Sequence, residues 1–207
     1  PIARLTEEGE GLPMRKLFSS KLFWILAVLM FASGASELSM SQWASAFAES
    51  GLGVSKTVGD LAGPCFFAVL MGCARVVYAK FGDRLNLLNV EILSSLLCVA
   101  AYLLAALSPI PALALLGCGL CGFSVGVMWP GTISVAARYL PKGGTAMFAL
   151  LALFGDLGCS GGPTLVGMVS GAMGGALKTG LLFAILFPAL LIAAALICKK
   201  ALKKRAE

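Results

Sequence analysis

The sequence has no histidine and few charged residues. Of its 207 residues, only 13% carry a charge, whereas 59% are hydrophobic. A soluble domain usually has about 25% charged residues, so this chain cannot cover a water-facing surface. The high apolar content also excludes a disordered chain. A transmembrane β-barrel needs alternating apolar and polar positions, whereas the apolar runs here are continuous. We therefore predict an all-α membrane protein.

Residue groups typical of enzymes and metal sites are also lacking. The seven cysteines all lie in apolar stretches, with no histidine to join them as metal ligands. Cys118 and Cys121 form a CxxC pattern between glycines, which favours small packing residues. The segment 51–57 (GLGVSKT) has serine where a phosphate-binding loop needs glycine before the lysine. We predict no enzyme activity, no metal and no cofactor.

Charge-free runs and prolines divide the chain into spans. A membrane-spanning helix needs about 20 mostly apolar residues, and Ser108-Pro109-Ile110-Pro111 interrupts the uncharged run over 92–137. We predict six transmembrane helices over about residues 22–49, 58–79, 87–107, 111–139, 143–172 and 176–198. The charged residues 1–21, which begin at Pro1, are interpreted as a cytoplasmic linker within a longer protein, and 199–207 as a basic cytoplasmic tail.

Lysine and arginine predict the orientation. With six spans both termini lie on one side, and that side collects all of the 16 basic residues except Lys56 and Lys178. Cytoplasmic loops carry an excess of such residues, so we expect both termini in the cytoplasm and a multi-pass protein of the plasma or inner membrane. The formal net charge of +6 then faces anionic lipid and implies no nucleic-acid partner.

Two acidic residues lie deep in the predicted spans. At helical rise Glu37 is about 22 Å past Leu22, and Asp156 is about 20 Å past Gly143, so both fall near mid-membrane. The sequence places no basic residue at a comparable depth. Because an ionisable group inside a membrane is a functional candidate, we expect both carboxyls to contact solute and bind protons. The alternative for each is a structural carboxyl bonded to a neighbouring helix.

Further polar residues recur every fourth position around Glu37 and form one helix face. They are Ser33, Glu37, Ser41 and Ser45, with Gln42 and Trp43 beside them. A polar face in a membrane either lines a solute pathway or bonds to a neighbouring helix, and we favour the pathway. Trp43 and Trp129 would then stack on a solute ring, although the aromatic belt of a membrane protein explains a tryptophan equally well.

Two other segments predict local features. Arg75, Lys80, Asp83 and Arg84 surround a short turn, where charges of both signs can form a cytoplasmic latch or simply a solvated turn. Gly161-Gly162-Pro163 predicts a break in the helix over 143–172, because proline removes a backbone donor. Glycine pairs such as 122/126 and 158/162 predict close helix packing.

Four segments resemble the major facilitator superfamily. ARVVYAKFGDR is similar to its cytoplasmic motif, with Ala79 in place of the first glycine and with Asp83 and Arg84 matching. GASELSMSQW resembles the seventh helix of fucose-permease-like members. GFSVGVMWPGTISVAARYLP and GDLGCSGGPTLVG resemble the fourth and fifth helices of the second half of such a transporter.

This resemblance implies the C-terminal six-helix half of a secondary active transporter, whose partner is the missing N-terminal half. The family moves small solutes by alternating access, and the subgroup suggests a sugar or related polar metabolite with proton symport. By position, the resemblance places Glu37, Gln42 and Trp43 toward the solute, with Trp129 and Asp156 as further candidates. Glu37 would lead proton coupling, and Arg75, Asp83 and Arg84 would belong to the cytoplasmic gate.

A second hypothesis remains open from the sequence. The chain could be a self-contained six-helix protein that homodimerises as a channel or a membrane scaffold. The two hypotheses differ in what covers the polar face around Glu37, which is an N-terminal half in the first case and a second copy in the other.

Overall fold

The computed structural model describes residues 12–206. Residues 1–11 and 207 lie outside this description, and so do the side chains of Asp83 and of residues 204–206. The N-terminal part of the predicted linker is therefore not described. The same holds for the predicted gate role of Asp83.

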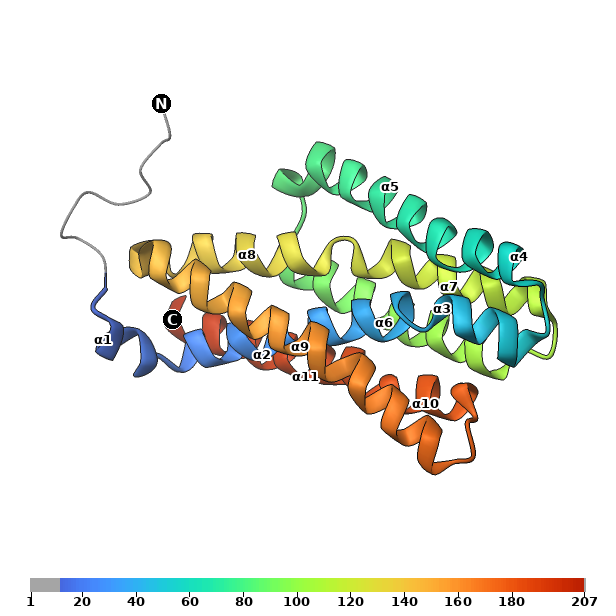
Figure 1. The fold of residues 1–207 in the computed structure, drawn as a ribbon. Helices are drawn as coiled ribbons and strands as arrows, with labels where there is room; N and C mark the ends of the chain where they lie inside the picture. Colours follow the sequence, from blue (N-terminus) through green and yellow to red (C-terminus); the bar gives the residue numbers. More distant parts are fainter. Residues whose placement is uncertain (1–11, 207) are drawn as a thin grey trace.

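The described residues form a bundle of helices, which confirms the prediction of an all-α protein with six candidate spans (Figure 1). Six helical segments are long and apolar enough to cross a membrane: Lys21–Ser50, Lys56–Phe81, Leu87–Leu107, Pro111–Tyr139, Pro141–Ala172 and Leu177–Lys203. They are built from α2 (Lys21–Ser41), α3 (Ala44–Ala46), α4 (Lys56–Asp60), α5 (Phe66–Phe81), α6 (Leu87–Leu107), α7 (Pro111–Val125), α8 (Met128–Tyr139), α9 (Gly144–Ala172), α10 (Leu177–Ala184) and α11 (Leu186–Ala206), after a short α1 (Met14–Phe18).

Four shorter helical turns complete the chain. The turns η1 (Phe47–Gly51) and η2 (Leu61–Cys65) are π-helical and widen the first two spans. The turns η3 (Gly82–Arg84) and η4 (Pro141–Gly143) are 3₁₀-helical and close loops between spans. π-Turns insert an extra residue into the ladder of backbone hydrogen bonds, and Pro64 within η2 removes a donor there.

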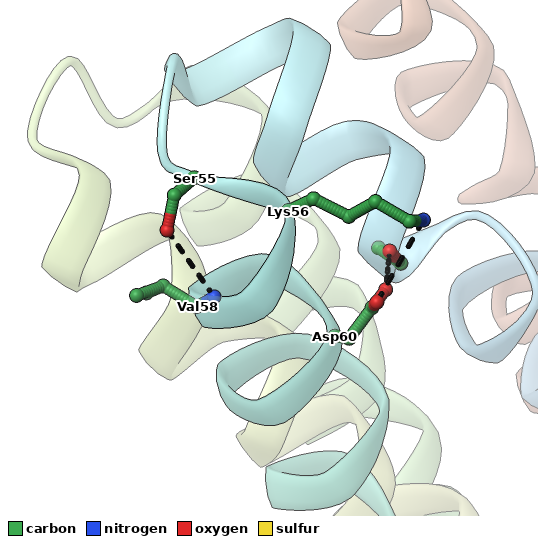
Figure 2. A network of polar contacts seen from close by, with 5 residues as sticks. Ser55, Lys56, Val58 and Asp60 are labelled. Carbon is green, nitrogen blue, oxygen red and sulfur yellow. Dashed lines mark hydrogen bonds and ion pairs between the residues drawn. The ribbon is translucent and has the colours of Figure 1, made fainter.

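Capping residues explain where two helices begin. The Asn86 side chain accepts a hydrogen bond of 3.2 Å from the Asn89 nitrogen at the start of α6. Ser55 accepts from the Val58 nitrogen at the start of α4, as Figure 2 shows. In each case the oxygen of a short polar side chain accepts a hydrogen bond from a backbone N–H that has no partner within the first helical turn.

The predicted break at Gly161-Gly162-Pro163 is wrong, because α9 runs unbroken from Gly144 to Ala172. Side-chain donors occupy backbone carbonyls around the proline. The Thr164 hydroxyl donates to the Ser160 carbonyl at 2.7 Å, and the Trp43 indole donates to the Pro163 carbonyl at 3.0 Å. Pro163 itself lacks the N–H that would bond the carbonyl of Cys159, four residues earlier, and α9 stays continuous without that bond.

Close contact between α2 and α9 forms the centre of the bundle. A Cβ atom at Gly158 would overlap the Phe31 carbonyl oxygen and lie 3.0 Å from the Ala35 nitrogen. A Cβ at Gly162 would lie 2.7 Å from the Ala35 carbonyl oxygen. Glycine at these positions lets the two backbones touch, as the four-residue spacing predicts.

Helix α5 lies at the outside of the bundle, at the top of Figure 1, and packs mainly on α7. The carbonyl group of Phe67 in α5 fills the space beside Gly122 in α7. Both α1 and the C-terminal end of α11 lie at the left of Figure 1. The loops over 82–86 and 140–143 connect spans at the same end, which we call the basic end.

Candidate functional site

A cavity of about 600 Å³ lies between three helices of the bundle. Its lining comes from α2, α5 and α8, namely Glu37, Arg75, Tyr78, Ala79, Trp129 and Pro130, and we call it the Glu37 cavity. Glu37 is half-buried, whereas Arg75 is exposed on α5. The cavity therefore brings a carboxyl and a guanidinium group from different spans to the wall of one space.

The structure corrects the sequence-based statement that Glu37 has no cation at its depth. Arg75 lies seven residues before Gly82 in a continuous helix, which is about 10 Å at helical rise. Its place in the sequence therefore groups it with the basic end, but its side chain lines the same cavity as Glu37. Within the described residues no ion pair within 4.0 Å joins the two groups, so the cavity separates them.

Trp129 is the aromatic residue of the Glu37 cavity that the sequence predicted. Its six-membered ring lies over Gly155 of α9, where an added Cβ would come within 2.6 Å of Cη2. Its Nε1 atom is buried and has no hydrogen-bond partner among the described residues. A buried donor without a partner costs free energy, and rearrangement or a bound ligand would relieve that cost.

Trp43 and Gln42 do not line this cavity. The Trp43 indole nitrogen is bonded to Pro163, and its ring lies 2.8 Å from where a Cβ of Gly167 would be. Gln42 is exposed at the C-terminal end of α2. In this conformation Trp43 joins α2 to α9 as a packing residue, and the solute contacts predicted for it and for Gln42 stay predictions.

The polar face around Glu37 bonds largely to its own surroundings. The buried Ser33 hydroxyl donates to the Leu29 carbonyl at 2.8 Å. Ser45 donates to the Asp60 carboxylate, whose other oxygen lies 3.7 Å from the Lys56 nitrogen (Figure 2). Ser45 thus bonds to a neighbouring helix, whereas Ser33 bonds within α2, and Glu37 is the residue of this face that lines the Glu37 cavity.

Asp156 is exposed on α9 and is not among the residues of the Glu37 cavity. Its backbone carbonyl accepts a hydrogen bond of 3.0 Å from the Ser160 hydroxyl. Between it and α2 lies Cys159, whose sulfur would be 2.9 Å from a Cβ on Gly34. The two predicted carboxyls thus belong to different surfaces, and the prediction that both bind protons is untested.

A third carboxyl, Glu91 of α6, was missed from the sequence. It is 1% exposed, and Thr132 of α8 donates to its Oε1 atom at 3.3 Å, while Oε2 has no partner among the described residues. Its carboxyl group also fills the space beside Gly131. In the sequence it lies one turn past a loop, inside the span predicted over 87–107, and its own segment gives no sign that it faces inward.

A second cavity of about 510 Å³ lies closer to the basic end. Its lining comes from α5, the loop after it, α6 and α8, namely Tyr78, Ala79, Gly82, Leu87, Ser134, Ala137 and Arg138, and we call it the Arg138 cavity. Arg84, which was predicted as a gate residue, is exposed in the adjoining turn η3. Arg75 lines the Glu37 cavity and Arg84 lies in η3, and the gate role predicted for both stays a prediction.

No group of three or more metal-binding side chains occurs among residues 12–206. The seven cysteines are free thiols, and both members of the CxxC pattern, Cys118 and Cys121, are buried. Cys121 lies 3.9 Å from Cys98 of α6, sulfur to sulfur. Cys98 and Cys121 therefore contribute to the packing between α6 and α7.

Comparison with known proteins gives one result. No curated protein and no solved structure matches the chain. The family model of the Major Facilitator Superfamily matches residues 3–163, which is more than half of the chain. The chain therefore belongs to the major facilitator superfamily, a family of multi-pass membrane transporters for small solutes.

Proposed function

We propose that this chain is the C-terminal six-helix half of a proton-coupled secondary transporter of the plasma or inner membrane, and that both its termini are cytoplasmic. Residues 1–21 would be the linker from the N-terminal half, 22–198 the transmembrane half-domain and 199–207 a basic tail. The solute would be a sugar or related polar metabolite, as in fucose-permease-like members. It would cross by alternating access.

The Glu37 cavity is the observation that carries this proposal. Glu37 and Arg75 come from different spans and line one space, with the Trp129 ring beside them. A carboxyl in a membrane must be neutralised, and here either a bound proton or the Arg75 guanidinium can do so. If the two groups approach and separate during the cycle, proton release and proton binding follow the movement of α5.

A polar solute fits the same lining. A carboxylate accepts hydrogen bonds from hydroxyl groups, a guanidinium donates to them, and an indole ring stacks on a sugar ring. A cavity of about 600 Å³ is in the usual range for a small-molecule site. The exposed side of α5 then supplies a surface that a second six-helix half can cover.

The test is proton movement by the full-length protein in proteoliposomes that contain a pH-sensitive dye. We expect members of a panel of neutral monosaccharides and polyols to drive proton uptake, and the Glu37→Gln variant to lose this signal. Solute exchange without a gradient should survive in that variant, because exchange needs binding but no net proton movement.

The matched control is Glu49→Gln, which removes an exposed carboxyl further along the same span. It should leave proton uptake unchanged. Proton uptake that persists in Glu37→Gln would contradict the coupling role of Glu37. Robust uptake by residues 1–207 alone would contradict the half-transporter proposal and favour a homodimer.

A further inference from the structure

The Glu37 cavity and the Arg138 cavity follow each other along one cleft between α5 and α8. Tyr78 and Ala79 line both cavities. On α8 the Glu37 cavity reaches Pro130, and the Arg138 cavity begins at Ser134, one turn later. Both helices end at the basic end, so the cleft leads from Glu37 toward that end of the bundle.

One hydrogen bond crosses the cleft at the boundary between the cavities. The Tyr78 hydroxyl donates to the Ser134 hydroxyl oxygen at 3.0 Å, and the Ser134 hydroxyl donates to the Pro130 carbonyl at 2.7 Å. Both side chains are half-buried. Between described residues, no other hydrogen bond links α5 to α8.

The surroundings make this bridge easy to open. Helix α5 packs mainly on α7, and Arg75, Ala79 and Lys80 are exposed. A neutral hydrogen bond contributes little net stability. A rotation of the Tyr78 side chain would therefore join the two cavities without breaking the packing of α5 on α7.

We propose that Tyr78 and Ser134 form a gate between the Glu37 cavity and the Arg138 cavity, and that solute passes along the α5–α8 cleft when it opens. The proposal rests on the proposed transport function. It assigns the gate to two uncharged side chains within one half of the transporter. Tyr78 lies six residues before Arg84, which belongs to the charged segment η3. The tyrosine ring is the barrier, and the serine holds it closed.

The test measures access to the Glu37 cavity and needs no solute. A reporter thiol is introduced by Arg75→Cys in the full-length protein, with the exposed Cys65 and Cys73 replaced by serine. A charged, membrane-impermeant thiol reagent is added to vesicles from the side of the basic end. We expect Tyr78→Phe to raise the labelling rate of this thiol about fivefold, the population shift that losing one neutral hydrogen bond allows.

A reporter at Arg138→Cys is the matched control, because it lies on the near side of the bridge. Its labelling rate should not change with Tyr78→Phe. Ser134→Ala should act like Tyr78→Phe, and the double variant should add nothing, because both single changes remove the same bond. An unchanged rate at Arg75→Cys, or equal increases at both reporters, would overturn the gate. Labelling does not depend on transport, so a failed gate and a failed transport function give different results.

Discussion

The first two spans of the bundle are similar in length but differ in how much of each is buried. In the most apolar stretch of Lys21–Ser50, 67% of residues are buried, against 17% in Lys56–Phe81. The first span contacts α9 backbone to backbone through glycines, whereas α5 in the second span packs mainly on α7. The bundle thus combines a closely packed span with a peripheral helix that carries part of the candidate site.

This difference indicates which parts of the site can move. Glu37 lies on the packed span, and Arg75 and Tyr78 lie on the loosely packed one. A change in the distance between Glu37 and Arg75 therefore requires movement of α5 and little change in the core. Three substitutions test this contrast, from the largest expected effect to the smallest.

The packed span should not tolerate one added methyl group. Gly158→Ala puts a Cβ against the Phe31 carbonyl, so α2 and α9 must separate. We expect the free energy of unfolding to fall by about 3 kcal/mol, at the upper end of overpacking costs. Chemical denaturation of the purified protein in detergent measures this change.

The matched substitution on the peripheral helix is Gly72→Ala, since an added Cβ there has no neighbour within 4 Å. It should raise the free energy of unfolding by about 0.5–1 kcal/mol, because alanine favours a helix over glycine. Similar losses of stability from both changes would contradict the contrast between the spans.

A substitution in the second span, Lys56–Phe81, should change transport more than it changes the stability of the fold. Arg75→Gln removes the cation of the Glu37 cavity from an exposed position. We expect solute uptake by the full-length protein to fall at least about tenfold, because hydrogen bonds to a charged group contribute roughly 1.5–3 kcal/mol. The amount of folded protein should not change. Lys80→Gln, an exposed cation on the same helix that does not line the Glu37 cavity, is the control, and an equal loss there would argue for a general charge effect.

A smaller loss of stability than that of Gly158→Ala is expected from removing the bond between the Trp43 indole and Pro163. Trp43→Phe keeps an aromatic ring beside Gly167 but removes the donor to the Pro163 carbonyl. We expect the free energy of unfolding to fall by about 1 kcal/mol. Trp24→Phe removes an exposed indole bond to the Phe18 carbonyl and should cost less. A larger loss from the Trp24 substitution would show that Trp43 does not help to hold α2 against α9.

The sequence predicted the helical class and the number of spans because both depend on long apolar runs between prolines and charges. It also predicted the contact at Gly158, since a four-residue glycine repeat marks a helix face. It failed where neighbours in space decide the outcome. Arg75 was grouped with the nearby turn, although its helix carries it beside Glu37.

Other failures have the same cause. Glu91 was not predicted as a site residue, because nothing in its own segment shows that its carboxyl lies against Thr132 and Gly131. The expected break at Pro163 did not occur, and the Trp43 indole, which donates to the Pro163 carbonyl, comes from 120 residues away. Local patterns therefore located the helices, and contacts between spans determined the candidate site.

The environments of the three tryptophans have a consequence for fluorescence. Trp24 is exposed, Trp43 is bonded to α9, and Trp129 lines the Glu37 cavity with an indole N–H that has no partner among residues 12–206. Of these emitters, Trp129 is the one whose surroundings change when the cavity fills or when α5 moves. With phenylalanine at positions 24 and 43, its emission wavelength becomes a direct optical readout of cavity occupancy, without any attached dye.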